Sequence, residues 1–369
     1  MAQLGDLARA KALLRSAARA FGPREAVARA RCVVAEFEIA LVSRELGWPA
    51  KTLDAARVTL ESHGDVLNAA HARYLSVRRL LLIGRLDEAE RALADLDPAP
   101  FPPALRTAHH LLVAGIAIRR LDTEVARAAL VRAADAARET VIPSLTAEVE
   151  SASLVLNTPA ARLLAYGEER LLLLEDVRAL LASKALVVDA CRNVVRRAPK
   201  VIALASRPVL FALARALGEA WPADVSRDTL VARAFGAKHA DASHRARLRV
   251  EIGRLRTMLR PVAGVKATKQ GFVLEPRPAR EVVVLAQPTE IDDEHAAVLA
   301  LLADGESWSS SALALTLGAS QRTVQRALDS LAAAGKVQWY GRGRARRWMT
   351  PPVGGFTTTL LLPAPLPEG

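Results

Sequence analysis

The spacing of apolar positions along the chain predicts helices first and short strands later. Residues 1–180 carry apolar side chains at helical periodicity, interrupted by short breaks rich in glycine and proline. From residue 185 short β-type runs alternate with helical segments, and the same mixture returns after Pro288. The pattern predicts a mainly α chain, with an array of helical hairpins at 1–180, two α+β domains at 185–280 and 289–350, and a tail at 351–369.

One pattern recurs within the helical region. The tetrapeptides LDAA at 53–56, LDEA at 86–89 and LDTE at 121–124 each follow a polar or glycine break, at spacings of 33 and 35 residues. We interpret each as a helix start, with Asp as a cap or first-turn charge and small alanines that let a partner helix approach. The segment LLLIGRLDEAERALADLDP resembles a tetratricopeptide repeat, whose period is about 34 residues. Such arrays offer a concave face to a protein, peptide or small ligand. A plain helical bundle is the alternative.

Two other features of this region concern packing. His109 and His110 are adjacent and point in different directions on a helix, so we expect packing or surface roles rather than metal binding. A predicted helix at 161–185, which contains LLLLEDVRALL, leads into the next domain. It could serve as a core helix or as a dimerisation helix.

Residues 185–275 follow the order sheet, three helices, hairpin. Short β-type runs are followed by predicted helices at 208–220, 224–236 and 243–259, and then by strands at 265–268 and 271–274. The apolar stripe of the third helix consists of Leu248, Ile252, Leu255 and Leu259. The opposite face and its flank carry Ser243, Arg245, Arg247, Arg249, Val250, Arg254 and Arg256. A helix face with several arginines suits the DNA major groove, where guanidinium groups bind guanine and phosphate.

The same segment resembles the winged-helix effector domain of response regulators of the OmpR/PhoB type. The resemblance rests on Val-Asp at 188–189, VSRDTL at 225–230, IGRLRTML at 252–259 and Gly-Phe at 271–272. It implies that the third helix reads the major groove, with Arg254 and Arg256 at arginine positions of the family. Arg247 and Val250 lie on the groove side, and a hairpin with Lys266 and Lys269 meets the minor groove or backbone. The hairpin tip is shorter than is common in the family, and residues 1–180 lack the pattern of a phosphoacceptor domain. Phosphorylation control is therefore not expected.

The segment after Pro288 resembles the helix-turn-helix and wing of many bacterial repressors. Helices are predicted at 292–303, 309–317 and 320–334, and strands at 337–340 and 347–349. The resemblance implies DNA contacts from the third helix and the wing, through Gln321, Arg322, Gln325, Arg326, Arg342, Arg344 and Arg346. Trp339 and Trp348 are expected to pack the hairpin. The acidic first helix leaves a protein partner, or a second copy of this module, as the alternative. A β-type run at 356–362 could add an edge strand or hang free.

The location of charge sharpens this picture. The chain has a net charge of +12, and residues 186–280 hold 19 Lys and Arg against 7 Asp and Glu. Residues 1–185 are nearly neutral, with 25 against 23. A basic block the size of one domain is the expected footprint of a polyanion, here double-stranded DNA.

Other function classes find little support in the sequence. Two distant cysteines exclude a disulfide scaffold and favour the cytoplasm, where a DNA-binding protein would associate with the nucleoid. The longest apolar runs are too short to span a bilayer, and no phosphate loop, dinucleotide motif, zinc-protease motif or nucleophile elbow occurs. We expect no enzyme activity, no cofactor and no metal. The sequence predicts a bacterial-type transcription regulator, monomeric or dimeric, whose helical repeats sense a partner or mediate assembly. A protein-interaction adaptor and a replication or plasmid-partition initiator are the alternatives.

Overall fold

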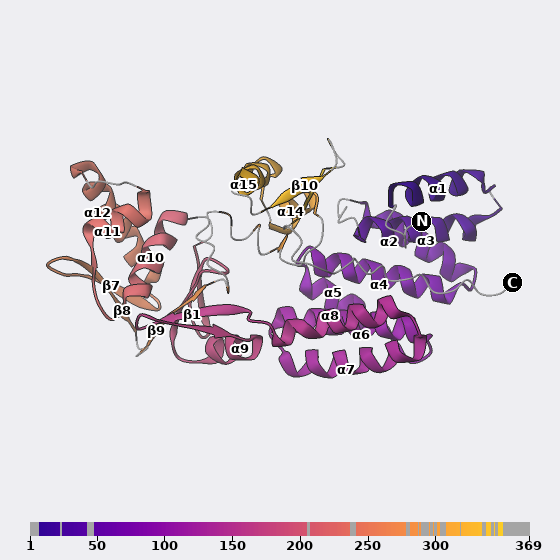
Figure 1. Ribbon diagram of the computed structural model, residues 1–369, viewed down its shortest axis with the longest axis horizontal. Coiled ribbons are helices and arrows are strands. Elements are labelled where there is room, and N and C mark those ends of the chain that lie inside the picture. The colour runs from indigo at the N-terminus through magenta and orange to yellow at the C-terminus, as the bar shows by residue number, and fades with distance from the viewer. Residues whose placement is uncertain are drawn as a thin grey trace. The chain divides into compact units, whose positions relative to one another are not determined.

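The structure, a computed structural model shown in Figure 1, describes residues 7–349 apart from short gaps. The gaps are residues 23, 43–47, 205–206, 237–240, 278–280, 287, 289–294, 296–297, 299–300, 303–307, 318, 334–336, 341–342 and 344–345. The described part of the chain is mainly helical, as predicted, and holds three sheets. It contains no helix with the length and apolar character needed to cross a membrane. The chain divides into unit 1, which is Met1–Leu154 with Asp293–Gly369, and unit 2, which is Val155–Asp292.

Helices alone build the N-terminal part of the described chain. Their bounds are α1 (Leu7–Ala20), α2 (Ala26–Val42), α3 (Ala50–Ser62), α4 (Val66–Leu82), α5 (Leu86–Ala94), α6 (Pro103–Arg120), α7 (Thr123–Thr140) and α8 (Pro143–Asn157). Each of α1 to α6 packs against the helix that follows it, and α4 also packs against α6. Leucine and alanine side chains of α4, α5 and α6 share a core with the buried Tyr74. The repeated pattern therefore corresponds to successive helix hairpins, α2–α3, α4–α5 and α6–α7.

The prediction that each aspartate of the repeated pattern caps or charges a helix start is confirmed for Asp122 and Asp87 and is wrong for Asp54. Asp122 caps α7 by accepting a hydrogen bond of 3.3 Å from a backbone amide of the first turn. Asp54 lies inside α3, because that helix begins directly after Pro49, whose fixed φ suits a helix start. Asp87 lies in the first turn of α5 and forms an ion pair with Arg120 of α6.

His109 is a packing residue, as predicted. Its side chain is 8% exposed, and its ring lies edge-on to Tyr74 with the centroids 5.8 Å apart. The Nδ1 atom is 3.4 Å from the Tyr74 hydroxyl. Burial, with a smaller contribution from the positive charges nearby, lowers the pKa of His109 to about 4.

The helical region of the wild-type protein should lose stability as the pH falls. We expect this loss to be smaller in the His109→Gln variant. The folded pKa lies below the unfolded value near 6.5, so the neutral form stabilises the fold at higher pH. This contribution is complete above about pH 6.5 and falls by about 3 kcal/mol as the pH approaches 4. Hydrogen exchange of the α6 amides at pH 7 and pH 4.5 measures the change. Equal changes in the wild-type protein and the variant would exclude His109 as the cause.

Unit 2 contains a six-stranded sheet in the order β2-β1-β9-β3-β4-β5. The strands are β1 (Ala161–Ala165), β2 (Glu168–Leu172), β3 (Leu186–Asp189), β4 (Val194–Arg197), β5 (Lys200–Ala203) and β9 (Val282–Ala286). Neighbours are antiparallel except β3 and β9, which are parallel. The predicted helix at 161–185 is wrong in its first half, since only α9 (Leu174–Ala182) is helical. Tyr166 and Gly167 both adopt positive φ, and they close a tight two-residue hairpin there.

The strand β9 ties the end of unit 2 to its beginning. It lies between β1 and β3, and all of its side chains are buried. Its continuous run of apolar residues suits a strand that is covered on both faces. The sheet therefore extends beyond both ends of the domain that the sequence places at 185–280.

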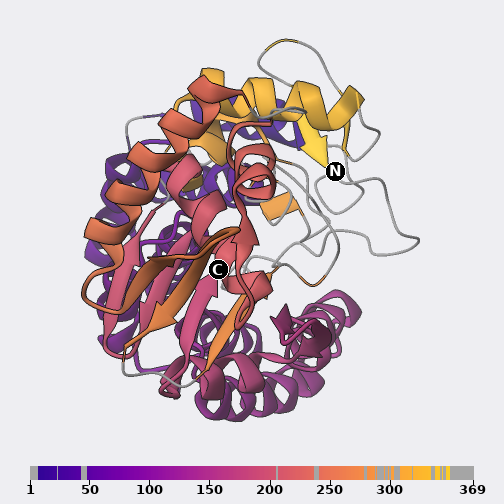
Figure 2. The same cartoon turned by 90° about the vertical axis from the view of Figure 1, so that its left-hand side faces the viewer.

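Three helices and a second, smaller sheet complete unit 2 (Figures 1 and 2). They are α10 (Pro208–Ala220), β6 (Val225–Ser226), α11 (Arg227–Phe235), α12 (Ala242–Leu259), β7 (Ala263–Ala267) and β8 (Gly271–Pro276), with the strands in the order β6-β8-β7. The first and third helices are confirmed to within one residue of their predicted bounds. The apolar stripe of the third helix is also confirmed, because all four of its side chains are buried. The strands β4 and β6 were not predicted.

The C-terminal part of unit 1 holds α14 (Ser310–Leu317), α15 (Gln321–Ala333), β10 (Gln338–Tyr340) and β11 (Arg347–Met349). These confirm the predicted second and third helices and the hairpin of this segment. Ser320 caps α15 by accepting a hydrogen bond of 3.1 Å from the amide of Thr323. Trp348 is 1% exposed and packs the hairpin, as predicted. Most of the predicted helix at 292–303 and the whole tail at 351–369 lie outside the described residues.

Candidate nucleic-acid interface

The outer face of α12 carries most of the residues that the sequence singles out. Asp241 caps the helix by accepting a hydrogen bond of 2.7 Å from the amide of His244, and this bond lowers the pKa of Asp241. The buried stripe fixes the rotation of the helix, so the opposite side faces outward. Residues exposed opposite the stripe are Ser243, Arg247, Val250 and Arg254, and Arg245 and Arg249 are exposed on one flank. The structure therefore exposes all of these predicted residues, with Arg247 and Arg254 on the face opposite the stripe.

Neighbouring groups orient three of these arginines. The guanidinium of Arg247 lies 4.5 Å from the centre of the Phe235 ring. Arg245 reaches Asp228 of α11, with 3.4 Å between nitrogen and oxygen, and Arg254 pairs with a glutamate one turn earlier at 2.8 Å. The Arg245 and Arg254 side chains remain more than half exposed. Exposed pairs of this kind contribute little to stability, so the guanidinium groups can exchange these partners for phosphate or a base.

Arg256, which the sequence assigns to the DNA contact, also braces the fold. Its Nε donates a hydrogen bond of 2.7 Å to the carbonyl of Val265 in β7, and its guanidinium lies 5.8 Å from the Phe272 ring. The side chain thus joins α12 to the hairpin on which it packs. The sequence places Arg256 on the flank of the arginine face, but the carbonyl that it binds could not be identified from helical periodicity.

The hairpin formed by β7 and β8 ends in a tightly held turn. The guanidinium of Arg227 donates hydrogen bonds to the carbonyls of Thr268 (3.1 Å) and Lys269 (3.0 Å). The hydroxyl of Thr268 donates to Asp224, and it accepts from the amide of Gly271 at 2.9 Å. Sequence reasoning missed both Arg227 and Asp224. The turn presents the exposed Lys269 at the tip, and Lys266 is exposed on β7.

We expect both Arg227→Ala and Arg227→Lys to loosen this turn. A planar guanidinium can bind two carbonyls at once, whereas an ammonium of the same charge does not reproduce that geometry. Hydrogen bonds to charged groups contribute about 1.5–3 kcal/mol, so amide exchange in residues 268–271 is expected to rise at least about tenfold. Hydrogen exchange measured by mass spectrometry tests this. Faster exchange in the alanine variant alone would mean that charge, not geometry, holds the turn.

A second basic surface lies on α15 in unit 1. Gln321, Arg322 and Arg326 are exposed, and Gln325 is half-buried with its amide 2.9 Å from Asp329. On the hairpin that follows, the guanidinium of Arg346 lies 4.7 Å from the centre of the Trp339 ring. Trp339 is 51% exposed, so it packs the hairpin less fully than predicted. The predicted wing residues Arg342 and Arg344 lie outside the described residues.

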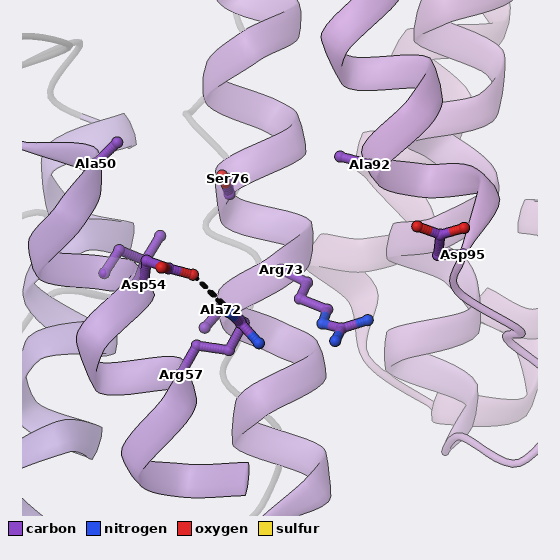
Figure 3. A pocket seen from close by; sticks show the side chains of 9 residues that line it. Ala50, Asp54, Arg57, Ala72, Arg73, Ser76, Ala92 and Asp95 are labelled. Atoms are coloured by element: carbon purple, nitrogen blue, oxygen red, sulfur yellow. Dashed lines mark hydrogen bonds and ion pairs between the residues drawn. The ribbon is translucent and has the colours of Figure 1, made fainter.

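The helical region of unit 1 has a cleft between α3, α4 and α5, shown in Figure 3. It has a volume of about 290 Å³. It is lined by Ala50, Leu53, Asp54, Arg57, Ala72, Arg73, Ser76, Ala92 and Asp95. Small side chains leave the space open, and charged ones stand around it (Figure 3).

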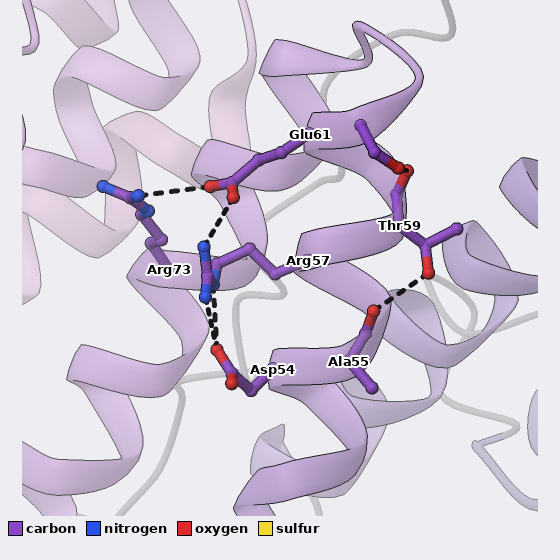
Figure 4. A network of polar contacts seen from close by, with 7 residues as sticks. Asp54, Ala55, Arg57, Thr59, Glu61 and Arg73 are labelled. Atoms are coloured by element: carbon purple, nitrogen blue, oxygen red, sulfur yellow. Dashed lines mark hydrogen bonds and ion pairs between the residues drawn. The ribbon is translucent and has the colours of Figure 1, made fainter.

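Four charged side chains at or beside this cleft, Asp54, Arg57, Glu61 and Arg73, form one network (Figure 4). Arg57 donates to Asp54 and to Glu61, at 2.6 Å each, and Glu61 also accepts from Arg73 of α4 at 3.1 Å. The hydrogen bond with Asp54 is the main reason that the pKa of Arg57 is raised. The network joins α3 to α4, and it pairs Asp54, Arg57 and Arg73 at the edge of the cleft.

Comparison with known proteins adds no relative to these observations. No protein-family model, curated protein or solved structure matched this chain. The interpretation of the arginine face on α12 therefore rests on its own geometry and charge.

Proposed function

We propose that the protein is a sequence-specific DNA-binding transcription regulator. The observation that carries the proposal is the exposed surface of α12, where Arg247 and Arg254 lie opposite a fully buried apolar stripe and two more exposed arginines lie on the flank. An α-helix fits the major groove of B-DNA, and arginine can bind guanine through two hydrogen bonds. The neighbouring arginines can hold phosphates and fix the position of the helix along the duplex.

The surroundings of α12 support a winged-helix interpretation of unit 2. The sheet β3-β4-β5, the helices α10, α11 and α12, and the hairpin β7–β8 follow one another in the order of a winged helix. The hairpin is the wing in this interpretation, with Lys266 and Lys269 meeting the backbone or the minor groove. The turn is short and firmly held. This favours contact with the DNA backbone over deep insertion into the minor groove.

The two parts of unit 1 have supporting roles in this proposal. The segment with α14, α15 and the hairpin β10–β11 acts as a second winged helix, and Arg322 and Arg326 face its DNA site. The hairpins α2–α3, α4–α5 and α6–α7 form a tetratricopeptide-like array that senses a partner or mediates assembly. The cleft in Figure 3 is the place in this array where a partner binds.

A salt titration tests the proposal. The full-length protein is titrated with a random-sequence duplex in a gel-shift or anisotropy assay at several salt concentrations. Each phosphate contact releases counterions, so the logarithm of the binding constant should fall linearly with the logarithm of salt concentration. Arg247→Ala is expected to reduce the slope, because it removes one cation from the face. No binding at low salt would overturn the DNA-binding function.

A further inference from the structure

The six-stranded sheet of unit 2 is open at both ends. Among the strands that the structure describes, none pairs with the outer edge of β2 or of β5. The pairings along the sheet make these two edge strands run in the same direction. Every side chain of β2 except Leu172, and every side chain of β5 except Ile202, is exposed. Exposed edges offer unpaired N–H and C=O groups to another chain.

Hydrogen bonds at the ends of β5 and β2 show which of their backbone groups point away from the neighbouring strands β4 and β1. The amide of Leu204 donates to the carbonyl of Asn193 at the end of β4, at 2.9 Å. Alternation along β5 therefore turns Val201 and Ala203 away from β4. The carbonyl of Leu172 accepts a hydrogen bond of 2.8 Å from Ala160, on the side of β1. By the same alternation, Glu169 and Leu171 of β2 point outward.

These outward groups match one parallel register. If Val201 of one copy lies opposite Arg170 of another, the Val201 amide meets the carbonyl of Glu169 and the Val201 carbonyl meets the amide of Leu171. This is the slanted pattern of a parallel ladder. The Ala203 amide then meets the carbonyl of Leu171, which gives three backbone hydrogen bonds.

The side chains match in the same register. Tracing paired residues across the sheet puts Lys200 and Ile202 on the same face as Glu169 and Leu171. In the register above, Lys200 lies beside Glu169 and Ile202 beside Leu171, which is 54% exposed. One contact joins opposite charges and the other joins aliphatic side chains, and such cross-strand neighbours stabilise a sheet.

We propose that unit 2 binds a second copy of the chain by adding the β5 edge of one copy to the β2 edge of the other. The contact is head-to-tail, so each copy keeps one free edge and further copies can join. Neither edge includes a residue of the α12 face. The assembly therefore does not depend on DNA, and it would let several copies line up on neighbouring sites.

The first test is the mass of the full-length protein, measured by light scattering or sedimentation from micromolar to submillimolar concentration. The wild-type mass should rise with concentration beyond that of a monomer. Val201→Pro should abolish the rise, because proline removes an outward amide while the bonds to β4 stay intact. Val201→Thr keeps that amide and is the matched control. A wild-type protein that stays monomeric, or a Val201→Pro variant that associates as well as Val201→Thr, would overturn the proposal.

A mixing experiment identifies the two edges without relying on proline. Lys200→Glu sets a carboxylate against Glu169 and blocks the β5 edge, and Leu171→Lys blocks the β2 edge. Each variant alone should be monomeric. An equal mixture should form a dimer and nothing larger, because only one compatible pair of edges remains. Lys184→Glu, an equal charge change at an exposed site away from both edges, should behave as wild type. A monomeric mixture would refute the edge pairing.

Discussion

The double variant Arg247→Ala, Arg254→Ala is expected to bind a selected DNA site about 2–6 kcal/mol more weakly than the wild-type protein. Each arginine that contacts a base contributes about 1–3 kcal/mol, and the two contributions should add approximately if both side chains reach the duplex. The dissociation constant should then rise by a factor of about 30 to about 20,000. A site selected from a random duplex pool with the wild-type protein, followed by anisotropy titration, measures it.

The control for this experiment is Arg138→Ala. Arg138 is an exposed arginine of α7 that pairs with an acid three residues earlier, as Arg254 does in α12. It should leave DNA binding unchanged. If the double variant binds the selected site as tightly as Arg138→Ala, α12 does not contact the DNA bases. The helix α15 would then be the remaining candidate for base contact.

Gly271→Ala is expected to destabilise unit 2 by about 3 kcal/mol. A methyl group on Gly271 would lie 1.7 Å from the carbonyl oxygen of Val225, an overlap that only a backbone shift can relieve. That shift breaks the pairing of β6 with β8 and releases the turn that Arg227 holds. Crowding in a packed site typically costs 1–3 kcal/mol, and here the neighbour is backbone rather than a flexible side chain. Urea unfolding, with hydrogen exchange to locate the change, measures the effect.

Gly253→Ala is the matched control for this substitution. Gly253 is an exposed glycine in the middle of α12, and no neighbouring atom lies within 4 Å of the position of an added Cβ. Alanine favours a helix over glycine by about 0.5–1 kcal/mol, so this variant should be slightly more stable than wild type. Equal destabilisation by both substitutions would mean that the close approach at Gly271 does not govern the stability of unit 2.

Local signals in the sequence predicted local structure well. The spacing of Leu248, Ile252, Leu255 and Leu259 predicted both the length of α12 and its buried side, because helical periodicity depends only on near neighbours. The β1–β2 hairpin was missed because leucine-rich segments satisfy helical spacing, and a single Tyr-Gly turn decided the outcome. The strand β9 was missed as well. Its partners are about 100 residues away, and no periodicity encodes them.

Part of the candidate site was likewise predictable from the sequence, and part was not. The exposed arginines of α12 followed from the apolar stripe, since whatever lies opposite a buried face is exposed. The contacts of Arg227 and Arg256 did not follow, because both bind backbone carbonyls in the hairpin and a carbonyl leaves no mark in the sequence. Composition located the basic surface, but only the structure separated arginines that face outward from those that brace the fold.

The central place of β9 has a consequence for synthesis of the protein. The strand that completes the middle of the sheet is the last of unit 2 to leave the ribosome, after both strands with which it pairs. Until then β1 and β3 each lack a neighbour, and contacts between such distant segments form slowly. A fragment that ends at residue 280 would stay in this incomplete state permanently. The smallest piece suited to DNA-binding experiments therefore runs from about residue 155 to the end of β9.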